Sequence, residues 1–216
     1  MAVIDIHTHN RKSLHLAILQ QIDPIQFEHN GYFSIGIHPA ESNSNTFQLL
    51  DAMPAILSLS NCIALGEIGL DNRLEIDLTI QEMVFIEQLK LAQTFNLPIL
   101  LHCVGAWDRC RFLHAQYAPN QFIVFHGFSK PSIVESVLEY EQSFISLGQT
   151  LLHSKALQLV IRDVPIERIF LETDTADVDL NLLYLQLAEL KQLSLQLVID
   201  QLWLNFKHVF NAHELA

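Results

Sequence analysis

Histidines and carboxylates occur at the ends of apolar segments in this 216-residue sequence. The first such segment leads into Asp5-Ile6-His7-Thr8-His9. If it forms a strand, successive side chains alternate between its two faces, so His7 and His9 point the same way. Two imidazoles at that spacing can bind one metal ion. An isolated pair of this kind is weak evidence, and its weight depends on the other segments.

Four more ligand-type residues share this placement, each in or directly after a later apolar run: Glu67, His102, His126 and Asp174. Burying an unpaired carboxylate or imidazole costs several kcal/mol, so six such positions indicate one shared metal site. Four imidazoles and two carboxylates suit zinc, manganese, cobalt or iron better than magnesium alone. Six ligands are too many for one catalytic metal with an open position and are enough for two bridged divalent ions, magnesium included.

The elements that must position these residues alternate along the chain. Eight near-continuous apolar runs predict strands buried on both faces: Val3–His9, His15–Gln20, Phe33–His38, Ile63–Ile68, Pro98–Cys103, Phe122–Phe128, Phe144–Gly148 and Ile169–Asp174. Strands that alternate with helices predict an α/β fold with a parallel sheet, here a (β/α)8 TIM-like barrel formed as one domain by residues 1–216. In such a barrel, the carboxyl ends of the strands meet at one mouth.

Helix signals lie between several of the predicted strands. Thr79 with Glu82 is typical of a capping box that opens a helix to about Phe95. Pro131 suits the first turn of a helix that reaches about Glu141. Ser194 is a candidate cap for a last helix with a stripe of core residues, Leu195, Val198, Leu202, Phe206 and Val209.

The first crossover helix is predicted to be missing, because only Asn10 to Leu14 separate the first two strands. A parallel crossover takes a dozen residues or more, so the second strand is expected to be short, antiparallel or displaced. An open, doubly wound sheet is the alternative fold, although no glycine-rich phosphate loop follows any predicted strand.

Charge and hydropathy limit the function classes. The chain has 24 acidic and 12 basic residues, a formal net charge of −12, which disfavours nucleic-acid binding unless bound metal reverses the local sign. Two divalent ions against Glu67 and Asp174 would leave such a local positive excess. No apolar stretch approaches the ~20 residues of a membrane helix, and the N-terminus is unlike a signal peptide. We therefore expect a cytoplasmic protein that does not interact with membranes.

In these respects the sequence resembles a TatD-family metal-dependent hydrolase over nearly its whole length. The motifs that carry the resemblance occur in order: Asp5-Ile6-His7-Thr8-His9, Gly36-Ile37-His38-Pro39, Gly66-Glu67-Ile68-Gly69-Leu70-Asp71, Gln81 with Phe85, Gln88-Leu89 and Leu91-Ala92, His102, His126-Gly127-Phe128-Ser129, Glu172-Thr173-Asp174, and Asn205 with Phe210. Members of that family are described as deoxyribonucleases, including 3′-to-5′ exonucleases on single strands.

The resemblance implies a two-metal site. His7, His9 and Asp174 would hold one ion, His102 and His126 the other, and Glu67 would bridge them. Asp174, as general base, and Glu67 are the expected catalytic carboxylates. A phosphodiester is the first substrate class, with the ends of single-stranded nucleic acid as one form of it.

Substrate recognition departs from the family pattern. Val104 and Asn72 occupy positions where the family usually has arginine and tyrosine, and the loop after Asp174 is short, so the chain is interpreted as a shortened member. His38, Trp107 and Lys130 are the candidate substrate-binding residues, as a phosphate donor, a base-stacking ring and a cation. Asp5 is left open between orienting a ligand and a structural role, and Glu172 is expected to be structural.

Two alternative functions use the same metal ligands. In one, the binuclear site hydrolyses a small amide, ester or cyclic C–N substrate. In the other, the protein is a metal-binding scaffold with weakened catalysis. The intact ligands argue against the scaffold, and the changed recognition residues argue for it.

Overall fold

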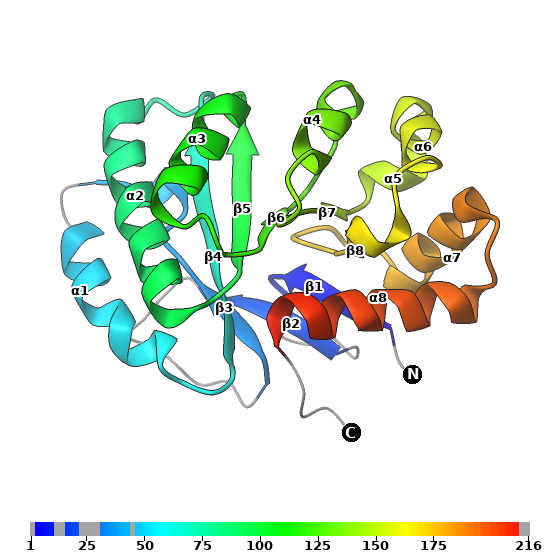
Figure 1. Ribbon diagram of the computed structural model, residues 1–216, viewed down its shortest axis with the longest axis horizontal. Helices are drawn as coiled ribbons and strands as arrows, with labels where there is room; N and C mark the ends of the chain where they lie inside the picture. The colour runs from blue at the N-terminus through cyan, green and yellow to red at the C-terminus, as the bar shows by residue number, and fades with distance from the viewer. Residues whose placement is uncertain (1–2, 11–15, 22–30, 44–45, 212–216) are drawn as a thin grey trace. The chain divides into compact units, whose positions relative to one another are not determined.

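A computed structural model describes residues 3–10, 16–21, 31–43 and 46–211 of the chain. Over these residues, eight strands pair in chain order from β1 to β8 in one sheet (Figure 1). Their bounds are β1 Ile4–Thr8, β2 Leu16–Gln21, β3 Phe33–Ile35, β4 Cys62–Asp71, β5 Ile99–Val104, β6 Ile123–Phe125, β7 Ser143–Leu147 and β8 Ile169–Leu171. The apolar runs are buried on both faces of their strands, as a parallel sheet requires.

The chain divides into two compact units. The first unit is Met1–Leu19 with Phe125–Ala216, and the second unit is Gln20–Val124. Each of them carries part of the predicted metal ligand set. The expectation of a single domain over residues 1–216 stays a prediction.

In the first unit, β1 pairs in parallel with β2, and β7 pairs in parallel with β8. A bridge between Thr8 and Asp174 also joins β1 to the segment that follows β8. The helices are α4 Val134–Leu138, α5 Thr150–His153, α6 Lys155–Ile161, α7 Leu180–Lys191 and α8 Leu195–Phe210. From α7, the buried Tyr184 hydroxyl donates to the carbonyl of Ile4 and accepts from its amide, both at 3.0 Å.

In the second unit, β4 pairs in parallel with β3 on one side and β5 on the other. The helices are α1 Thr46–Leu57, α2 Leu78–Phe95 and α3 Trp107–Tyr117. Helices α2 and α3 lie beside β4 and β5 (Figure 1). Phe85, Leu89 and Ala92 of α2 are fully buried, as the predicted helical face requires.

Several local predictions need correction. The N-cap of α2 is Asp77, whose carboxylate accepts from the amide of Thr79, and Glu82 instead binds Arg109. A carboxylate is as good a cap as a hydroxyl, so the earlier acidic residue takes the position. Ser194 does cap α8, but Leu195 is 38% exposed and does not join its core stripe.

Three strands, β3, β6 and β8, end three residues earlier than predicted, and one strand pairs differently. β3 stops at Ile35 because the backbone of Ile37 bonds to the Gln88 side chain instead of continuing the ladder. β8 stops at Leu171, and Asp174 has a left-handed φ of 53°. β2 is parallel to β1, so the antiparallel alternative is wrong. Of the predicted strand His15–Gln20, His15 lies outside the described residues, as do residues 11–14 of the expected short connection.

Among the described residues, the helices are all too short or too polar to cross a lipid bilayer.

Candidate metal centre

Three predicted ligands of the first unit converge on one point. Oδ1 of Asp174 lies 3.5 Å from Nε2 of His7 and 3.5 Å from Nε2 of His9. His7 is fully buried, whereas about a quarter of the His9 side chain and over a third of the Asp174 side chain are exposed. The alternation of side chains along β1 places both imidazoles on the face next to Asp174. The cluster is therefore buried at His7 and accessible to solvent at His9 and Asp174.

Asp5 accepts hydrogen bonds from residues on both segments of this cluster. Its carboxylate accepts from the hydroxyl of Thr173 at 2.6 Å, from the Thr173 amide at 3.0 Å and from the His7 amide at 3.4 Å. Burial raises the pKa of Asp5 to about 6, against the opposing effect of the Thr173 hydrogen bonds. Asp5 thus ties the residue before Asp174 to the backbone of His7, which favours the orienting role over a merely structural one.

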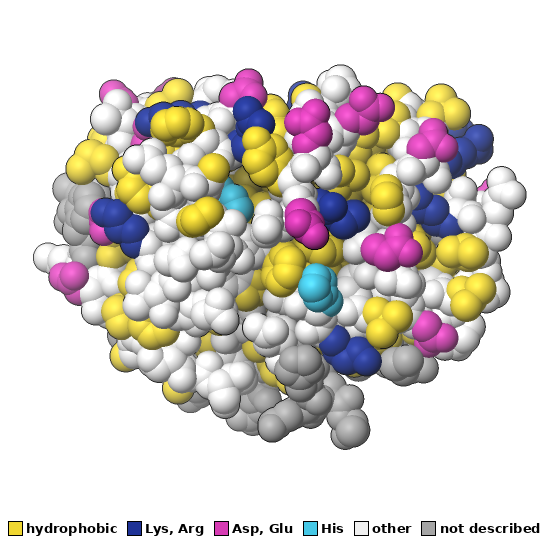
Figure 2. Space-filling view, viewed as in Figure 1, with side chains coloured by type: hydrophobic (Ala, Val, Ile, Leu, Met, Phe, Trp, Pro, Cys, Tyr) yellow, Lys and Arg dark blue, Asp and Glu magenta, His cyan; other side chains and the backbone are white. Residues whose placement is uncertain are grey.

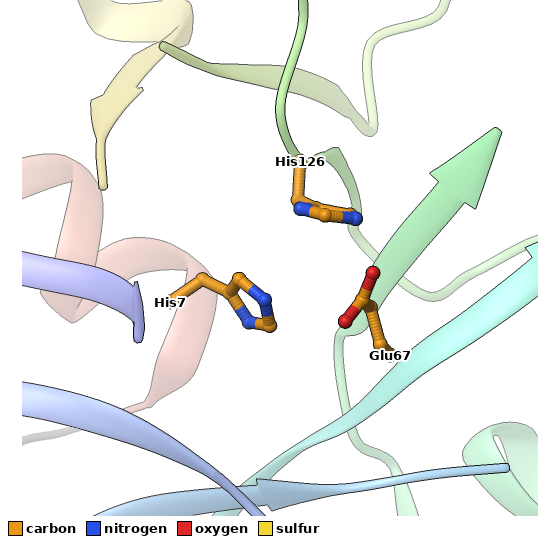
Figure 3. Close-up of side chains that lie close together, drawn as sticks. All are labelled: His7, Glu67 and His126. Carbon is orange, nitrogen blue, oxygen red and sulfur yellow. The ribbon is translucent and has the colours of Figure 1, made fainter. Parts of the chain in front are cut away.

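His126 also belongs to the first unit, directly after β6. Its ring centroid is 4.7 Å from that of His7, and Figure 3 draws the two side chains close together. On the other side of the ring, Nδ1 of His126 lies 3.4 Å from Oε1 of the fully buried Glu172. The same oxygen accepts from the Gly127 amide at 2.6 Å. Glu172 therefore fixes the backbone directly after His126 through Gly127 and lies beside the His126 ring, which fits the structural role predicted for it.

The second unit carries Glu67, on β4, and His102, on β5; Figure 3 draws Glu67 on its strand. Nδ1 of His102 lies 3.0 Å from Oε1 of Glu67, and Nε2 lies 3.1 Å from Oδ2 of Asp71. Both carboxylates are buried. A carboxylate on the far nitrogen fixes the tautomer and the ring orientation of a metal-binding histidine, so Asp71 leaves Nδ1 of His102 to face Glu67.

Sequence reasoning assigned no role to Asp71, although it is a carboxylate at the end of a buried strand, like Glu67. Arg73 donates to both of its carboxylate oxygens, at 3.0 Å from Nε and 2.7 Å from Nη2. These hydrogen bonds hold the pKa of Asp71 well below its usual range, against the effect of burial. Asp71 therefore stays charged and can accept from His102 at any pH near neutrality.

Gly69 allows His102 to sit this close to β4. The two residues are partners in the β4–β5 register, and Gly69 has a φ of 148°. A Cβ at Gly69 would lie 1.9 Å from the carbonyl oxygen of His102. Only glycine fits at this position, because any side chain would push the His102 backbone away.

His38 follows β3, and its ring centroid lies 4.4 Å from that of His102. Its Nδ1 accepts from the Ala40 amide at 3.0 Å, and its Nε2 lies 3.7 Å from Oε1 of Glu67. A neutral imidazole that accepts at one nitrogen carries its proton on the other. In this orientation Nε2 of His38 is a donor, which fits the predicted contact with a phosphate better than metal ligation.

The donor sets fit divalent metal. Ligand atoms of His7, His9 and Asp174 all lie within 4.8 Å of one another. The ligand atoms of His38, Glu67 and His102 are equally close, but Nε2 of His38 presents a proton there, so the metal donors of the second unit are Glu67 and His102. Two donors that each lie ~2.1 Å from a tetrahedral ion are ~3.4 Å apart, which matches the spacing of Asp174 from His7 and His9. Imidazole with carboxylate is a donor set for zinc, manganese, cobalt or iron. The predicted bridge by Glu67 and the pairing of His126 with His102 stay predictions.

The other two substrate-binding candidates, Trp107 and Lys130, belong to different units. Trp107 begins α3 and is half-buried, with the Arg111 guanidinium 5.9 Å from its ring centre. Lys130 is exposed and precedes the 3-10 turn Pro131–Ile133 in the first unit. Their predicted roles in substrate binding stay predictions.

Comparison with known proteins supports the interpretation of these clusters. The family described as TatD related DNase matches residues 3–211. An uncharacterized metal-dependent hydrolase of Escherichia coli, YjjV, is 28% identical over 177 residues, which are 77% of this chain and 64% of that protein. The 3′-5′ ssDNA/RNA exonuclease TatD of a Pantoea strain is 29% identical over 162 residues, covering 72% of this chain and 62% of the relative. The chain thus spans less than two thirds of these relatives' length.

Solved structures support the fold. The crystal structure of Escherichia coli YjjV superposes with a TM-score of 0.80 at 23% identity, covering 97% of this chain and 98% of that one. A TatD-family hydrolase of Entamoeba histolytica has a TM-score of 0.78 at 18% identity over the same shares of the two chains. Together with the strand order, this likeness confirms the predicted (β/α)8 TIM-like fold.

Proposed function

This chain belongs to the TatD family, and from that premise we propose that it is a divalent-metal-dependent hydrolase that cleaves phosphodiester bonds with water. The observation that carries the proposal is the convergence of His7 and His9 on Oδ1 of Asp174, each at 3.5 Å. Three ligand atoms that meet at a partly exposed point leave room for a substrate to reach an ion.

We assign the metal ligands by unit. His7, His9 and Asp174 would hold an ion in the first unit, and Glu67 with Nδ1 of His102 would hold an ion in the second. Divalent ions bound by these residues would lower the pKa of the attacking water and offset the negative charge that develops on the phosphoryl oxygens. Asp71 would keep the ring of His102 in place through Nε2, the nitrogen that does not face Glu67.

The chain's own groups handle the proton and the phosphate. Oδ2 of Asp174 is the oxygen we assign to take the proton from water, because Oδ1 faces the two histidines. Nε2 of His38 donates a hydrogen bond to a phosphoryl oxygen, as the acceptor role of its Nδ1 dictates. General base catalysis of this kind contributes ~10²–10⁴-fold to a rate.

For the substrate, we propose short phosphodiesters and the ends of single-stranded nucleic acid. Relatives named as 3′-5′ ssDNA/RNA exonucleases support that class. On the face drawn in Figure 2, basic side chains are scattered singly among acidic and apolar ones, and the net charge is −12. Such a surface attracts a long polyanion only weakly. We therefore propose that the substrate makes few phosphate contacts and that these lie close to the metal ligands.

A substrate panel tests the proposal. The purified protein, loaded with Zn²⁺ or Mn²⁺, is given single-stranded DNA, RNA, a model aryl phosphodiester, and small amides and lactones. We expect metal-dependent hydrolysis of the phosphodiesters and none without metal. Turnover of the amides or lactones alone would assign the site to C–N or carboxylic ester chemistry, and tight metal binding without any turnover would make the protein a scaffold.

A further inference from the structure

We infer that two buried glutamines of α2, Gln81 and Gln88, are positioning residues for the ligand cluster of the second unit. The inference rests on the proposed function, because it concerns how His102 and His38 are held for metal and substrate. Gln81 would act on the metal ligand and Gln88 on the phosphate donor.

Both glutamines occupy the face of α2 that packs on the sheet beside it (Figure 1). They are seven residues apart, which is about two helical turns and places them on one side. Gln81 is 1% exposed and Gln88 is fully buried, between apolar neighbours such as Phe85 and Leu89. A buried amide without hydrogen bonds costs ~1–3 kcal/mol, so polar residues on this face need compensating partners.

Gln88 finds both partners on one residue. Its Oε1 accepts from the Ile37 amide at 2.6 Å, and its Nε2 donates to the Ile37 carbonyl at 3.1 Å. The side chain thus replaces a neighbouring strand at the point where β3 has ended. Ile37 directly precedes His38, so Gln88 fixes the backbone from which the His38 ring reaches toward Glu67.

Gln81 makes the corresponding contact at the end of β4. Its Oε1 accepts from the Asp71 amide at 2.9 Å, and its Nε2 donates to the carbonyls of Asp71 at 3.2 Å and Ile76 at 2.8 Å. The Asp71 carboxylate in turn lies 3.1 Å from Nε2 of His102. Gln81 therefore acts on the metal ligand through Asp71.

The two positions predict different effects. Groups that orient a metal-binding histidine typically contribute 10–100-fold to metal affinity. We expect Gln81→Met to lower the affinity of the second-unit ion by at least about tenfold. Gln88→Met should leave metal affinity unchanged and reduce turnover of a model phosphodiester, because it displaces a donor that does not bind metal.

Calorimetric titration with Zn²⁺ measures the change in metal affinity of Gln81→Met. The same titration of His102→Ala shows which of the binding events belongs to the second-unit cluster. The matched control is Gln158→Met, a buried glutamine of the first unit whose Nε2 donates to the Leu151 carbonyl at 2.8 Å. It should lose comparable stability and keep its Zn²⁺ affinity and its turnover. Gln81→Met with wild-type affinity would overturn the assignment of Gln81.

A double-mutant cycle measures the second effect. If Gln88 acts through His38, then Gln88→Met combined with His38→Gln should be no slower than His38→Gln alone. Full additivity of the two losses would overturn the assignment. In either measurement, a wild-type protein that binds no second ion and cleaves no phosphodiester refutes the proposed function instead, so the two failures are distinguishable.

Hydrogen exchange of the wild-type protein keeps the inference testable if a variant does not fold. If local unfolding breaks the Gln81–Asp71 hydrogen bond, Asp71 no longer holds the His102 ring in the orientation that binds metal. Metal bound to His102 must therefore make this local unfolding rarer. Saturating Zn²⁺ should slow exchange of the Asp71 amide at least tenfold relative to the Thr79 amide, which Asp77 caps at the start of α2. Unchanged exchange at Asp71 would contradict the role of Gln81.

Discussion

The amide of Asp174 donates to the carbonyl of His7 at 2.9 Å, and the carboxylate of the same Asp174 lies 3.5 Å from Nε2 of His7. One residue therefore makes both the backbone contact that joins the two segments and the side-chain contact of the candidate metal site. The Asp174 carbonyl also accepts from the His9 amide at 3.0 Å. These two backbone hydrogen bonds therefore fix the spacing of Asp174 from the two histidines.

Replacing Asp174 with asparagine separates these two functions. Asparagine tolerates the left-handed φ of 53° at this position, so the backbone contact with His7 should survive and the free energy of unfolding of the metal-free protein should change by less than about 1 kcal/mol. Loss of the carboxylate should lower phosphodiester turnover by at least about 100-fold. Chemical denaturation and steady-state kinetics provide the two numbers.

The matched control for that substitution is Asp177→Asn, in the same loop but with an exposed side chain. It removes the same charge and should retain both stability and turnover. Wild-type rates in the Asp174→Asn protein would show that neither the base nor the ligand role belongs to Asp174.

Substitution of Glu67 and substitution of His38 should have different effects on the metal content of the protein. Glu67→Gln replaces a buried carboxylate that faces Nδ1 of His102, so metal content and activity should fall together. His38→Gln removes a donor whose other nitrogen is bound to the Ala40 amide, so activity should fall while metal content stays at the wild-type level. Elemental analysis of both purified variants decides this, and depletion in His38→Gln would make His38 a metal ligand.

A buried histidine away from the ligands should make stability depend on pH. Burial lowers the pKa of His114, despite the hydrogen bond between its Nε2 and the Gln121 carbonyl. In the unfolded chain His114 has a pKa of about 6.5. Below that pH, His114 takes up a proton in the unfolded chain but not in the folded chain. The free energy of unfolding should therefore hold above pH ~6.5 and decrease as the pH falls toward the folded pKa.

Urea unfolding of the metal-free wild type and of His114→Gln, between about pH 5.5 and 7.5, measures how much of the pH dependence of stability comes from His114. The variant should show a shallower decrease, because it no longer titrates there. His153→Gln, at an exposed histidine of the first unit, should follow the wild type. Parallel pH curves for wild type and His114→Gln would show that His114 is protonated equally in both states.

The strands could be predicted from sequence because strands buried on both faces appear as apolar runs with polar residues at their ends. His7 and His9 were identifiable for the same reason, since a period of two fixes their common side. The contacts that orient the ligands could not be predicted in this way. Asp71 meets His102 across 31 positions and Gln88 meets Ile37 across 51, so only the folded chain shows that they touch.

Where a strand or helix ends was also beyond the sequence pattern. The apolar run of β3 continues to Ile37, but its backbone groups bind a side chain from α2, and so the ladder stops at Ile35. At α2, two acceptable cap residues stand two positions apart, and Asp77 takes the place that the Thr79–Glu82 pair indicated. In each case a competing hydrogen bond of similar strength decides the boundary.

The last prediction concerns the length of nucleic acid that the protein contacts. The positive excess that metal would bring is local, and at ~0.15 M salt it is screened over ~8 Å, while the whole chain carries −12. Each phosphate contact on a single strand adds ~0.7 to the slope of log affinity against log salt. We expect a shallow slope, equivalent to about one to three contacts, and rates on small phosphodiesters comparable to those on oligonucleotides. Affinity of the Mn²⁺-loaded protein for a fluorescent single strand at a series of salt concentrations measures the slope. A slope of six contacts or more, or efficient cutting within intact duplex, would reveal a basic surface that neither the composition nor the face in Figure 2 contains.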